Sequence, residues 1–219
     1  MKKIIIIGAD VSGMNIHTII EDINDIKSEW QIIAYLDEFK KEGESLFKIP
    51  IFSSFEEIVS SKKIKPEETF VISAIGNPKN RCRLMEQAKR IGFKATTIIH
   101  PSANISKQAN IEEGCIFCQF SSVHPFAKIE PFCYVHSGTI IGPKAEILKG
   151  VTINSLCAIS AKTKIGKKSY IGVGTKVIQG IKIGEETTLA AGSVVIKDLP
   201  DRVLAAGVPA KIKKTNYGN

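Results

Sequence analysis

Residues 165–189 read IGKKSYIGVGTKVIQGIKIGEETTL, with a large apolar residue at every sixth position. The same spacing runs without a break through seventeen positions of the C-terminal half. These anchors are Ile99, Ile105, Ile111, Phe117, Val123, Ile129, Val135, Ile141, Ile147, Ile153, Ile159, Ile165, Ile171, Val177, Ile183, Leu189 and Val195. An α-helix repeats every 3.6 residues and a strand every 2, so neither keeps a residue in one environment at this spacing. The pattern predicts a coil whose rungs are built from six-residue sides.

The fourth residue after each anchor is mostly small. The small residues are Ala103, Ala109, Cys115, Ser121, Ala127, Cys133, Thr139, Ala145, Cys157, Thr163, Ser169, Thr175, Thr187 and Ser193. Large and small residues therefore alternate along each short strand, which suits the inside of a narrow triangular prism. We expect both sets to face inward.

The start of this repeat near residue 99 divides the 219-residue chain almost in half, which predicts two domains, 1–97 and 98–219 with a C-terminal tail. The composition is that of an ordinary soluble protein, and no run approaches the roughly 20 apolar residues of a membrane span. The opening MKKIIIIGAD stops its apolar run at Gly8, whereas a secretory core needs about 7 to 15 residues. We expect a first β-strand there and a cytoplasmic protein.

The five cysteines fit a reducing compartment. Cys115 and Cys118 form a CxxC, but no second pair follows at zinc-finger spacing, so we expect packed, reduced thiols and no metal. The formal net charge of +8 comes from basic residues spread along the chain, without the basic runs and stacking aromatics of a nucleic-acid binder. The charge instead favours small molecules that carry phosphate as partners.

The N-terminal half alternates strand-like and helix-like segments. KIIIIGA is typical of a buried parallel strand, and the isoleucines after Gly13 have helical spacing. The segments are a strand at 3–9, a helix after Gly13, a strand at 30–38, a helix at 54–62, a strand at 69–76 and a helix from Pro78 to about Arg90. This order predicts an α/β domain with a small Rossmann-like, doubly wound parallel sheet.

Three loops of this sheet converge on one crevice. The first turn, Gly8-Ala9-Asp10-Val11-Ser12-Gly13, lacks the middle glycine of the dinucleotide motif GxGxxG, but its helix N-terminus can still hold a phosphate. The acidic pair after the second strand could accept hydrogen bonds from ribose or sugar hydroxyls, or could be solvated turn residues. The expected substrate-binding residues are Asp10, Val11, Ser12, Gly13, Asp37, Glu38, Gly76 and Asn77.

Hexads such as Ile171-Gly-Val-Gly-Thr and Ile183-Gly-Glu-Glu-Thr resemble the repeat of left-handed β-helix acyltransferases. The ending AAGSVVIKDLPDRVLAAGVPAKIKK, residues 190–214, is similar to the C-terminal signature of that family. Together with IIIIGAD, AYLDE and AIGNPKNR, the resemblance covers nearly the whole chain. It points to bacterial sugar O- and N-acyltransferases of the sialic acid O-acetyltransferase type, which include nucleotide-sugar N-acetyltransferases. It implies that an all-β left-handed parallel β-helix of hexapeptide repeats follows the α/β domain.

The resemblance implies a homotrimer, acetyl-CoA as acyl donor in the groove between neighbouring coils, and a nucleotide-linked amino sugar held by the N-terminal domain, for surface polysaccharide biosynthesis. Family contacts to the cofactor correspond to Val173 and Ala191, and steps of eighteen continue this column to Ser155 and Ser137. A thioester would then lie near Ser137, with His136 and Asn154 beside it. The cofactor-binding residues so expected are Thr152, Asn154, Ser155, Gly172, Val173, Ala191 and Lys211.

We expect specific roles for two features of this cofactor site. A backbone N–H at the turn near Gly172 or Val173 could stabilise the oxyanion of an acyl-transfer step. Lys211, followed by Lys213 and Lys214, could meet the phosphates of coenzyme A, or could belong to an exposed solubilising tail.

The chain departs from the family at the usual histidine base and its carboxylate partner, which align with Pro143 and Lys144. Of its four histidines, we expect His17 and His100 to be structural, and we favour His136 over His124 as the base because it adjoins the cofactor column. Alternatively, water or the substrate takes the proton, or the protein is a non-catalytic ligand-binding or scaffold member. A γ-type carbonic anhydrase would need three histidines per zinc, which four scattered histidines disfavour. Amino and hydroxyl acceptors both remain open.

Overall fold

The computed structural model describes residues 1–40 and 43–216. The chain divides into two compact units, one formed by Met1–Gly76 with Asn80–Ile98 and one by Asn77–Lys79 with Ile99–Asn219.

The N-terminal unit is built on a six-stranded sheet with the order β3-β4-β2-β1-β5-β6. Its strands are β1 Lys2–Ile7, β2 Trp30–Leu36, β3 Ser45–Leu46, β4 Ile49–Phe52, β5 Phe70–Ser73 and β6 Lys94–Ala95. All neighbours are parallel except the edge pair β3 and β4, which is an antiparallel hairpin. The expected parallel α/β sheet is thus confirmed for β1, β2 and β5, and the short hairpin makes the complete sheet mixed.

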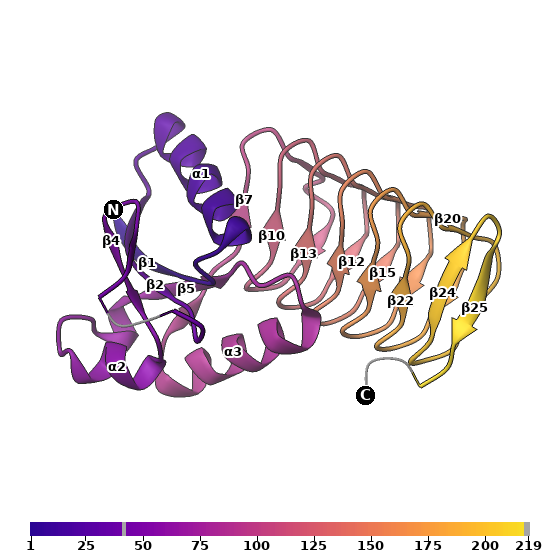
Figure 1. Ribbon diagram of the computed structural model, residues 1–219. Helices are drawn as coiled ribbons and strands as arrows, with labels where there is room; N and C mark the ends of the chain where they lie inside the picture. Colours follow the sequence, from indigo (N-terminus) through magenta and orange to yellow (C-terminus); the bar gives the residue numbers. More distant parts are fainter. Residues whose placement is uncertain (41–42, 217–219) are drawn as a thin grey trace. The chain divides into compact units, whose positions relative to one another are not determined.

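Helices cover both faces of this sheet (Figure 1). They are α1 Val11–Ile26, α2 Phe55–Ser60 and α3 Pro78–Ile91, with a short 3-10 turn η1 at Pro66–Glu68. The helix expected after Gly13 begins two residues before it, at Val11, with Asp10 in extended conformation at its N-cap. The last four isoleucines of β1 are fully buried, as a central strand covered on both faces requires.

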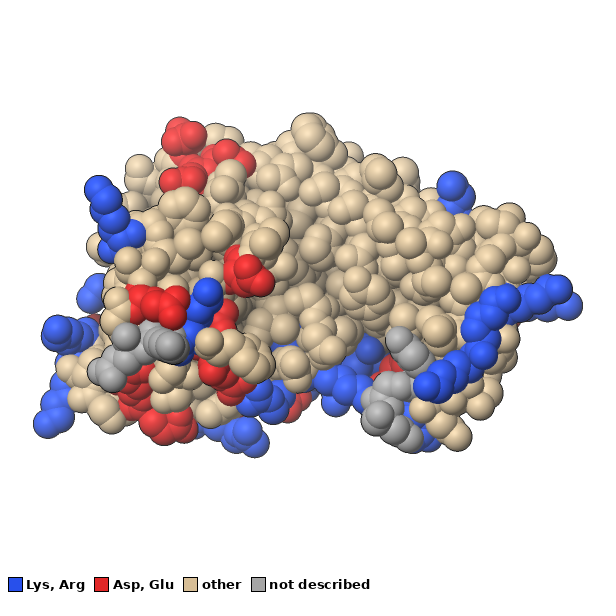
Figure 2. Space-filling model, viewed as in Figure 1, with Lys and Arg blue, Asp and Glu red and all other residues tan. Residues whose placement is uncertain are grey.

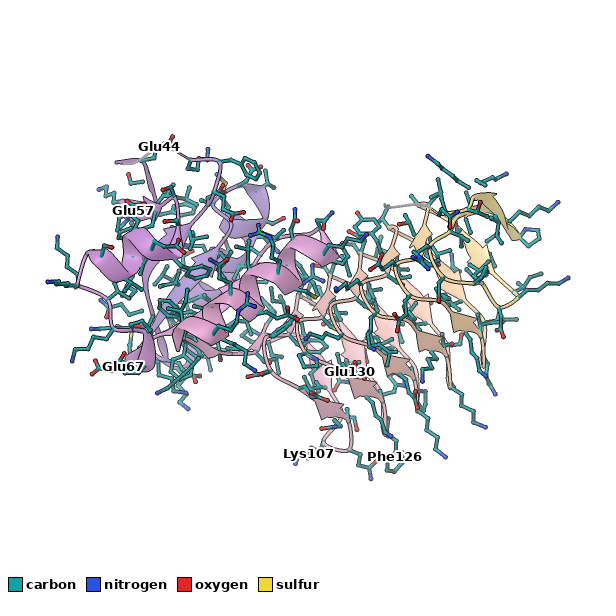
Figure 3. The ribbon with its side chains drawn as sticks, turned by 90° about the horizontal axis from the view of Figure 1, so that it is seen from below. Glu44, Glu57, Glu67, Lys107, Phe126 and Glu130 are labelled. Atoms are coloured by element: carbon teal, nitrogen blue, oxygen red, sulfur yellow. The ribbon has the colours of Figure 1, made fainter. Side chains whose placement is uncertain are left out.

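The second unit is a parallel β-helix, in which the short strands of successive rungs stack into three sheets that form the sides of the coil (Figure 1 and Figure 3). The first sheet contains β7 Ile98–Ile99, β10 Ile116–Phe117, β13 Tyr134–Val135, β16 Thr152–Ile153, β19 Tyr170–Ile171, β22 Thr188–Leu189, β24 Leu204–Gly207 and β25 Ala210–Lys214. The second contains β8 Asn104–Ile105, β11 Ser122–Val123, β14 Ile140–Ile141, β17 Ala158–Ile159, β20 Lys176–Val177 and β23 Val194–Val195. The third contains β9 Asn110–Ile111, β12 Lys128–Ile129, β15 Glu146–Ile147, β18 Lys164–Ile165 and β21 Lys182–Ile183.

The anchors stack in register, so that Ile129 pairs with Ile147 and Ile147 with Ile165. Every anchor from Phe117 to Val195 is buried, which confirms the predicted inward face. The first three anchors differ: Ile99 has 38% of its surface exposed, and Ile105 and Ile111 are half-buried against the core. The expectation that Ile99 faces a closed interior was wrong, because the repeat only begins at this rung.

The small residues expected to face inward are buried from Cys115 to Ser193. Their polar atoms find partners in backbone carbonyls: Thr139 Oγ1 donates to Asn154 O at 2.8 Å, and Cys133 Sγ contacts Leu148 O at 3.2 Å. A hydroxyl or thiol inside an apolar coil loses its water, so such a bond offsets much of the cost of burial. All five cysteines are free and buried, as packed thiols should be.

Candidate functional site

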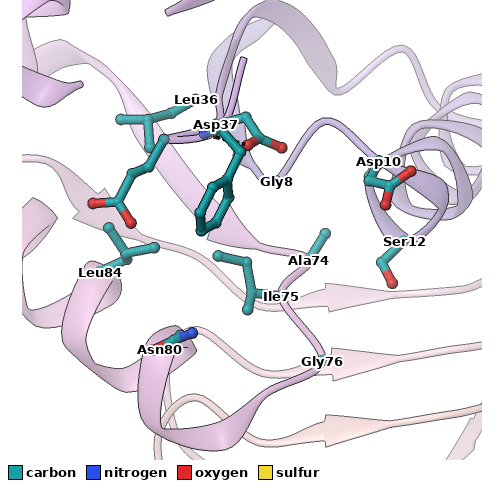
Figure 4. A pocket seen from close by; sticks show the side chains of 13 residues that line it. Gly8, Asp10, Ser12, Leu36, Asp37, Ala74, Ile75, Gly76, Asn80 and Leu84 are labelled. Carbon is teal, nitrogen blue, oxygen red and sulfur yellow. Dashed lines mark hydrogen bonds between the residues drawn. The ribbon is translucent and has the colours of Figure 1, made fainter. Parts of the chain in front are cut away.

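A cavity of about 220 Å³ lies in the N-terminal unit where β1, β2 and β5 end (Figure 4). Its lining residues are Gly8, Asp10, Ser12, Gly13, Leu36, Asp37, Glu38, Phe39, Ala74, Ile75, Gly76, Asn80 and Leu84. Open α/β sheets commonly bind ligands at the carboxyl ends of their strands, where loops of different strands meet. The cavity is therefore placed where a ligand site is expected.

Two glycines shape the side of the cavity next to α1. Gly8 has a φ of +104°, which side chains rarely adopt, and a Cβ on Gly13 would lie 2.2 Å from the carbonyl oxygen of Gly8. The helix consequently starts in close contact with the loop, and its first N–H groups, which have no partners within the helix, lie next to the cavity. Asp10 makes no side-chain capping hydrogen bond. Figure 4 shows Asp10 and Ser12 together at this end of the cavity.

The acidic pair after β2 is already engaged in hydrogen bonds. Asp37 Oδ2 accepts from the N–H of Ala9 at 2.9 Å, and its Oδ1 accepts from the N–H of Phe39 at 3.0 Å. Glu38 accepts from Arg83 of α3 at 2.5 and 3.2 Å. This bond raises the pKa of Arg83. Asp37 thus ties two loops of the cavity together, and its role toward a sugar hydroxyl stays a prediction.

Six of the eight predicted substrate residues line the cavity, namely Asp10, Ser12, Gly13, Asp37, Glu38 and Gly76. Val11 is 73% exposed and is not among the lining residues, and Asn77 instead accepts the N–H of Lys79 at 3.0 Å in the first turn of α3. The sequence reasoning missed Phe39, Asn80 and Leu84. The helical spacing of Asn80 and Leu84, four residues apart, was a signal that both share one face of α3.

In the β-helix, the four predicted cofactor-column residues lie along one corner. Ser137 O accepts from Leu156 N at 3.0 Å, Ser155 O from Gly174 N at 2.9 Å and Val173 O from Gly192 N at 2.8 Å. Each of these donors directly follows the next member of the column, so the bonds stack Ser137, Ser155, Val173 and Ala191 rung upon rung. Val173 and Ala191 are exposed.

His136 lies just before this corner and is half-buried. Its ring stacks on Tyr134 with 4.0 Å between the ring centroids and an interplanar angle of 18°. On the next rung, Asn154 uses its Nδ2 to donate to Ile171 O at 2.8 Å. Thr152 is fully buried in the ladder next to Tyr134. The geometry places His136, Ser137, Thr152 and Asn154 on adjacent rungs, and their roles toward a ligand stay predictions.

The corner does not offer every backbone donor that was expected. The N–H of Gly172 donates to Leu189 O at 2.9 Å, so it is already used in the ladder. Gly172 as an oxyanion donor was therefore wrong, because the hydrogen bonding of the sheet extends one residue beyond β19. Val173, the other donor expected there, lies two rungs from Ser137, about 10 Å at the spacing of neighbouring strands, so its N–H is too far from an acyl group placed beside His136.

Lys211 is exposed on β25, which pairs antiparallel with β24. Figure 2 shows basic side chains over these C-terminal strands, whereas most acidic side chains visible in this view lie on the N-terminal unit. Basic residues at this end of the coil could hold an anionic group, and the alternative of a solubilising surface stays open.

Two family models each match a part of this chain. Residues 3–88 match the PglD N-terminal domain, and residues 162–197 match the bacterial transferase hexapeptide model of six repeats. The chain combines a PglD N-terminal domain with bacterial transferase hexapeptide repeats.

Solved structures extend the likeness over almost the whole chain. PerB from Caulobacter crescentus, in complex with CoA and GDP-perosamine, is 26% identical, with a TM-score of 0.85 and 97% of both chains covered. The acetyltransferase domain of PglB from Neisseria gonorrhoeae, in complex with acetyl coenzyme A, is 27% identical, with a TM-score of 0.68 over 96% of this chain and 98% of that one. Other structures of the Caulobacter enzyme carry a histidine replaced by asparagine or alanine.

Curated relatives match only a short part of this chain. A putative acetyltransferase of Saccharomyces cerevisiae is 51% identical over 43 residues, which are 20% of this chain and 22% of that protein. A tetrahydropyridine-dicarboxylate N-acetyltransferase of Clostridium perfringens is 49% identical over 45 residues, 20% of this chain and 19% of that protein. The chain thus spans about a fifth of the length of these relatives.

The remaining histidines of this hexapeptide-repeat protein differ in their surroundings. His17 is buried, shares a hydrogen bond with the hydroxyl of Tyr35 and lies 3.4 Å from Glu21. Burial and Glu21 raise the pKa of Tyr35. His100 Nδ1 accepts from the N–H of Ser102 at 2.9 Å at the start of the coil. Both are structural, as expected, whereas His124 is half-buried on the coil surface.

Pro143, which we expect to take the position of the usual family base, contributes a carbonyl that accepts from Lys162 N at 2.9 Å. Its backbone is therefore part of the coil, and its ring supplies no base. Within residues 1–40 and 43–216, no cluster of three or more His, Cys, Asp or Glu side chains has the arrangement of a metal site. In the same ranges no helix is both long and apolar enough to span a membrane.

Proposed function

We propose that this protein transfers an acetyl group from acetyl-CoA to the amino group of a nucleotide-linked sugar, in the assembly of surface glycans. The observation that carries the proposal is the likeness over 97% of the chain to PerB, whose structure holds CoA and GDP-perosamine. The cavity at the strand ends and the column at the coil corner supply a place for each ligand. We assign nucleotide-sugar binding to residues 1–97 and acyl-donor binding to residues 98–219.

The acyl donor would lie along the corner column. Exposed Val173 and Ala191 leave room for a pantetheine arm, and Ser155 and Asn154 lie further along. Thr152 has no exposed surface in the chain and could only support this surface from behind. Lys211 has no acidic neighbour on its own strand. Acetyl-CoA supplies an activated acyl carbon in its thioester. The chain itself would orient this group at the end of the column near His136.

The attacking amine must lose one proton during the reaction. The amine nitrogen attacks the thioester carbonyl, the new C–N bond forms, the C–S bond breaks, and coenzyme A leaves as its thiolate. The amine proton passes to His136, which then returns a proton to the departing thiolate. Such a base contributes typically about 10² to 10⁴ in rate, so positioning alone retains part of the activity when the base is lost.

Release of free thiol from acetyl-CoA tests this proposal. The purified full chain should release thiol only when a nucleotide-linked amino sugar is present, and the sugar product should gain the mass of one acetyl group. A panel of uridine- and guanosine-linked amino sugars that gives no release, while a known acetyltransferase does, contradicts the proposal. Sugars that carry only hydroxyl groups separate ester from amide formation.

The matched variants His136→Ala and His124→Ala test the base. Both histidines are half-buried on the coil and directly follow an inward anchor. We expect His136→Ala to lower kcat by about 10² or more, and His124→Ala to leave it unchanged. Equal kcat in His136→Ala and the unmodified protein would remove the assignment.

Pro143 and Lys144 favour a second candidate, a non-catalytic member that binds the ligands without acyl transfer. This protein would be stabilised by acetyl-CoA or a nucleotide sugar, since a ligand that binds only the folded state raises the melting temperature. Any turnover in the thiol assay would exclude it.

We also propose that the coil forms a homotrimer. Large apolar side chains are exposed on neighbouring columns of one side, including Phe120 at 73%, Leu156 at 68% and Ile140 at 46%. Contiguous exposed apolar patches commonly mark protein contacts. Sedimentation should give three times the mass of the 23.9 kDa chain, and Leu156→Glu should reduce it. The free cysteines favour the cytoplasm as the place of the reaction.

A further inference from the structure

A tight turn at the end of β2 places an aromatic ring beside the cavity. The N–H of Lys40 donates to Asp37 O at 3.1 Å, which closes a turn over residues 37–40. The N–H of Phe39 donates to Asp37 Oδ1 at 3.0 Å. An aspartate at the first position of a turn fixes the backbone two residues later in this way. Phe39 therefore occupies a defined backbone position.

Contacts with the loop after β1 and with α3 also fix this turn. Asp37 Oδ2 accepts from Ala9 N in the loop after β1, and both oxygens of Glu38 bind the guanidinium of Arg83 on α3. A fork-like pair of this kind restricts orientation as well as distance. The backbone that carries Phe39 is thus tied to two other sides of the cavity.

The side chain of Phe39 is nevertheless 92% exposed. A single exposed apolar residue is ordinary on a protein surface, but this ring lines a cavity whose other members include Leu36, Ile75 and Leu84. At about 220 Å³, the cavity is smaller than the roughly 300–1,000 Å³ of sites that enclose a drug-sized ligand. The cavity would hold only part of a nucleotide-linked sugar, and a ring at the rim can cover the part that extends outside.

We infer that Phe39 is the platform on which the nucleobase of the nucleotide-linked sugar stacks. The inference rests on the proposed function and adds a residue that positions the substrate. The diphosphate would lie at the first turn of α1, where Figure 4 shows Asp10 and Ser12 across the cavity from Leu84. The base would then extend toward the turn after β2.

The two carboxylates next to Phe39 already have hydrogen-bond partners in the protein, so we expect the base to be recognised by stacking and not by hydrogen bonds to them. Both oxygens of Asp37 accept backbone N–H groups, and Glu38 is paired with Arg83. Stacking accepts any base because every base has a π face. The contribution of Phe39 should therefore be similar for a pyrimidine and a purine nucleotide.

Titration calorimetry of the full chain with UDP, GDP and inorganic pyrophosphate tests the inference. Loss of one base–aromatic stack corresponds to about fivefold or more in affinity. Phe39→Leu should weaken UDP and GDP by at least that factor and leave pyrophosphate binding unchanged, and Phe39→Trp should restore both nucleotides. Phe126→Leu, which shortens an exposed ring on the β-helix, is the matched control and should bind all three as the unmodified protein does.

Unchanged UDP and GDP affinities in Phe39→Leu would overturn the inference while leaving the proposed function intact. An equal loss of pyrophosphate would show that the residue only supports the loop, which also overturns it. If the unmodified protein binds none of the three probes, both the inference and the assignment of the N-terminal cavity to nucleotide sugars fail.

Discussion

The β-helix and the N-terminal unit bury their residues by different rules. In the coil each anchor stacks on another of its kind, as Ile129 does on Ile147, and one spacing governs the whole interior. In the N-terminal unit the core strand β1 is equally buried, but the cavity is formed by loops that Asp37 and the Glu38–Arg83 pair tie together. A repeat therefore specifies an interior, whereas a ligand cavity depends on hydrogen bonds between loops that are far apart in sequence.

The largest effect should come from breaking the stack of the coil. Ile129 and Lys128 are adjacent in β12, the first 1% exposed and the second exposed. Ile129→Ala leaves a cavity in a close-packed interior and should cost about 2–5 kcal/mol of stability. Lys128→Ala should change it by less than about 0.5 kcal/mol. Denaturant unfolding checks this, and similar midpoints for the two variants would contradict the inward and outward alternation.

A smaller effect is expected where α1 meets the loop after β1. Alanine is usually more stable than glycine in a helix by about 1 kcal/mol. A Cβ on Gly13 would lie 2.2 Å from the carbonyl oxygen of Gly8, so the backbone must move. We expect Gly13→Ala to lose about 2 kcal/mol, a typical cost of overpacking, while Ser12→Ala loses less than 1 kcal/mol. A stabilised Gly13→Ala in thermal unfolding would show that this contact is not tight.

The bond between His17 and Tyr35 should give a smaller and pH-dependent effect. Tyr35→Phe leaves a buried imidazole nitrogen without its partner, at a cost of about 1 kcal/mol. Because burial and Glu21 raise the pKa of Tyr35 above its ordinary value of 10.0, the folded phenol keeps its proton when the unfolded chain has lost it. Its contribution is present below pH 10 and decreases above it.

Stability measured between pH 9 and pH 11 checks this sign. The unmodified protein should lose stability more steeply over that range than Tyr35→Phe does. Tyr170→Phe, on the surface ladder of the coil, is the matched control and should follow the unmodified protein. Parallel curves for Tyr35→Phe and the unmodified protein would contradict the account.

The last prediction concerns the chemical reactivity of a buried thiol, that of Cys157, and changes the stability of the fold least. Burial raises the pKa of Cys157 to about 11, so very little thiolate is present at pH 8. Alkylation of this residue, followed by mass spectrometry of its peptide, should be roughly a hundredfold slower in the folded chain than in the unfolded one. Equal rates would show that the interior of the coil is open to solvent.

Much of the fold could be predicted from the sequence, for a physical reason. A period of six has one explanation in backbone geometry, and β1 is a run of isoleucines that only a buried strand accommodates. The hairpin β3–β4 and the strand β6 escaped prediction because segments of two to four residues have no measurable period. The first anchor, Ile99, was misplaced because spacing alone does not reveal where a stack begins.

The candidate site was predicted less completely. Six of the residues that line the cavity followed from the rule that ligands bind at strand ends, and their role toward a substrate stays a prediction. Phe39 was missed because its place depends on hydrogen bonds to Asp37, which no spacing reports. Gly172 was wrongly expected to have a free N–H, since sequence does not show that the ladder continues past β19. Hydrogen bonds that join loops or rungs depend on the three-dimensional structure, so the spacing of residues in the sequence could not predict them.

The central claim is that each unit holds its own ligand, the nucleotide sugar at the strand ends and acetyl-CoA along the coil corner. Two single carboxylate insertions test it: Ser12→Glu in the first turn of α1 and Ala191→Glu on the exposed corner column. Calorimetric titration of each variant with UDP and with CoA is the measurement. Ser12→Glu should lose UDP and keep CoA, and Ala191→Glu should lose CoA and keep UDP. Loss of both ligands in either variant, or of neither in both, would contradict the account.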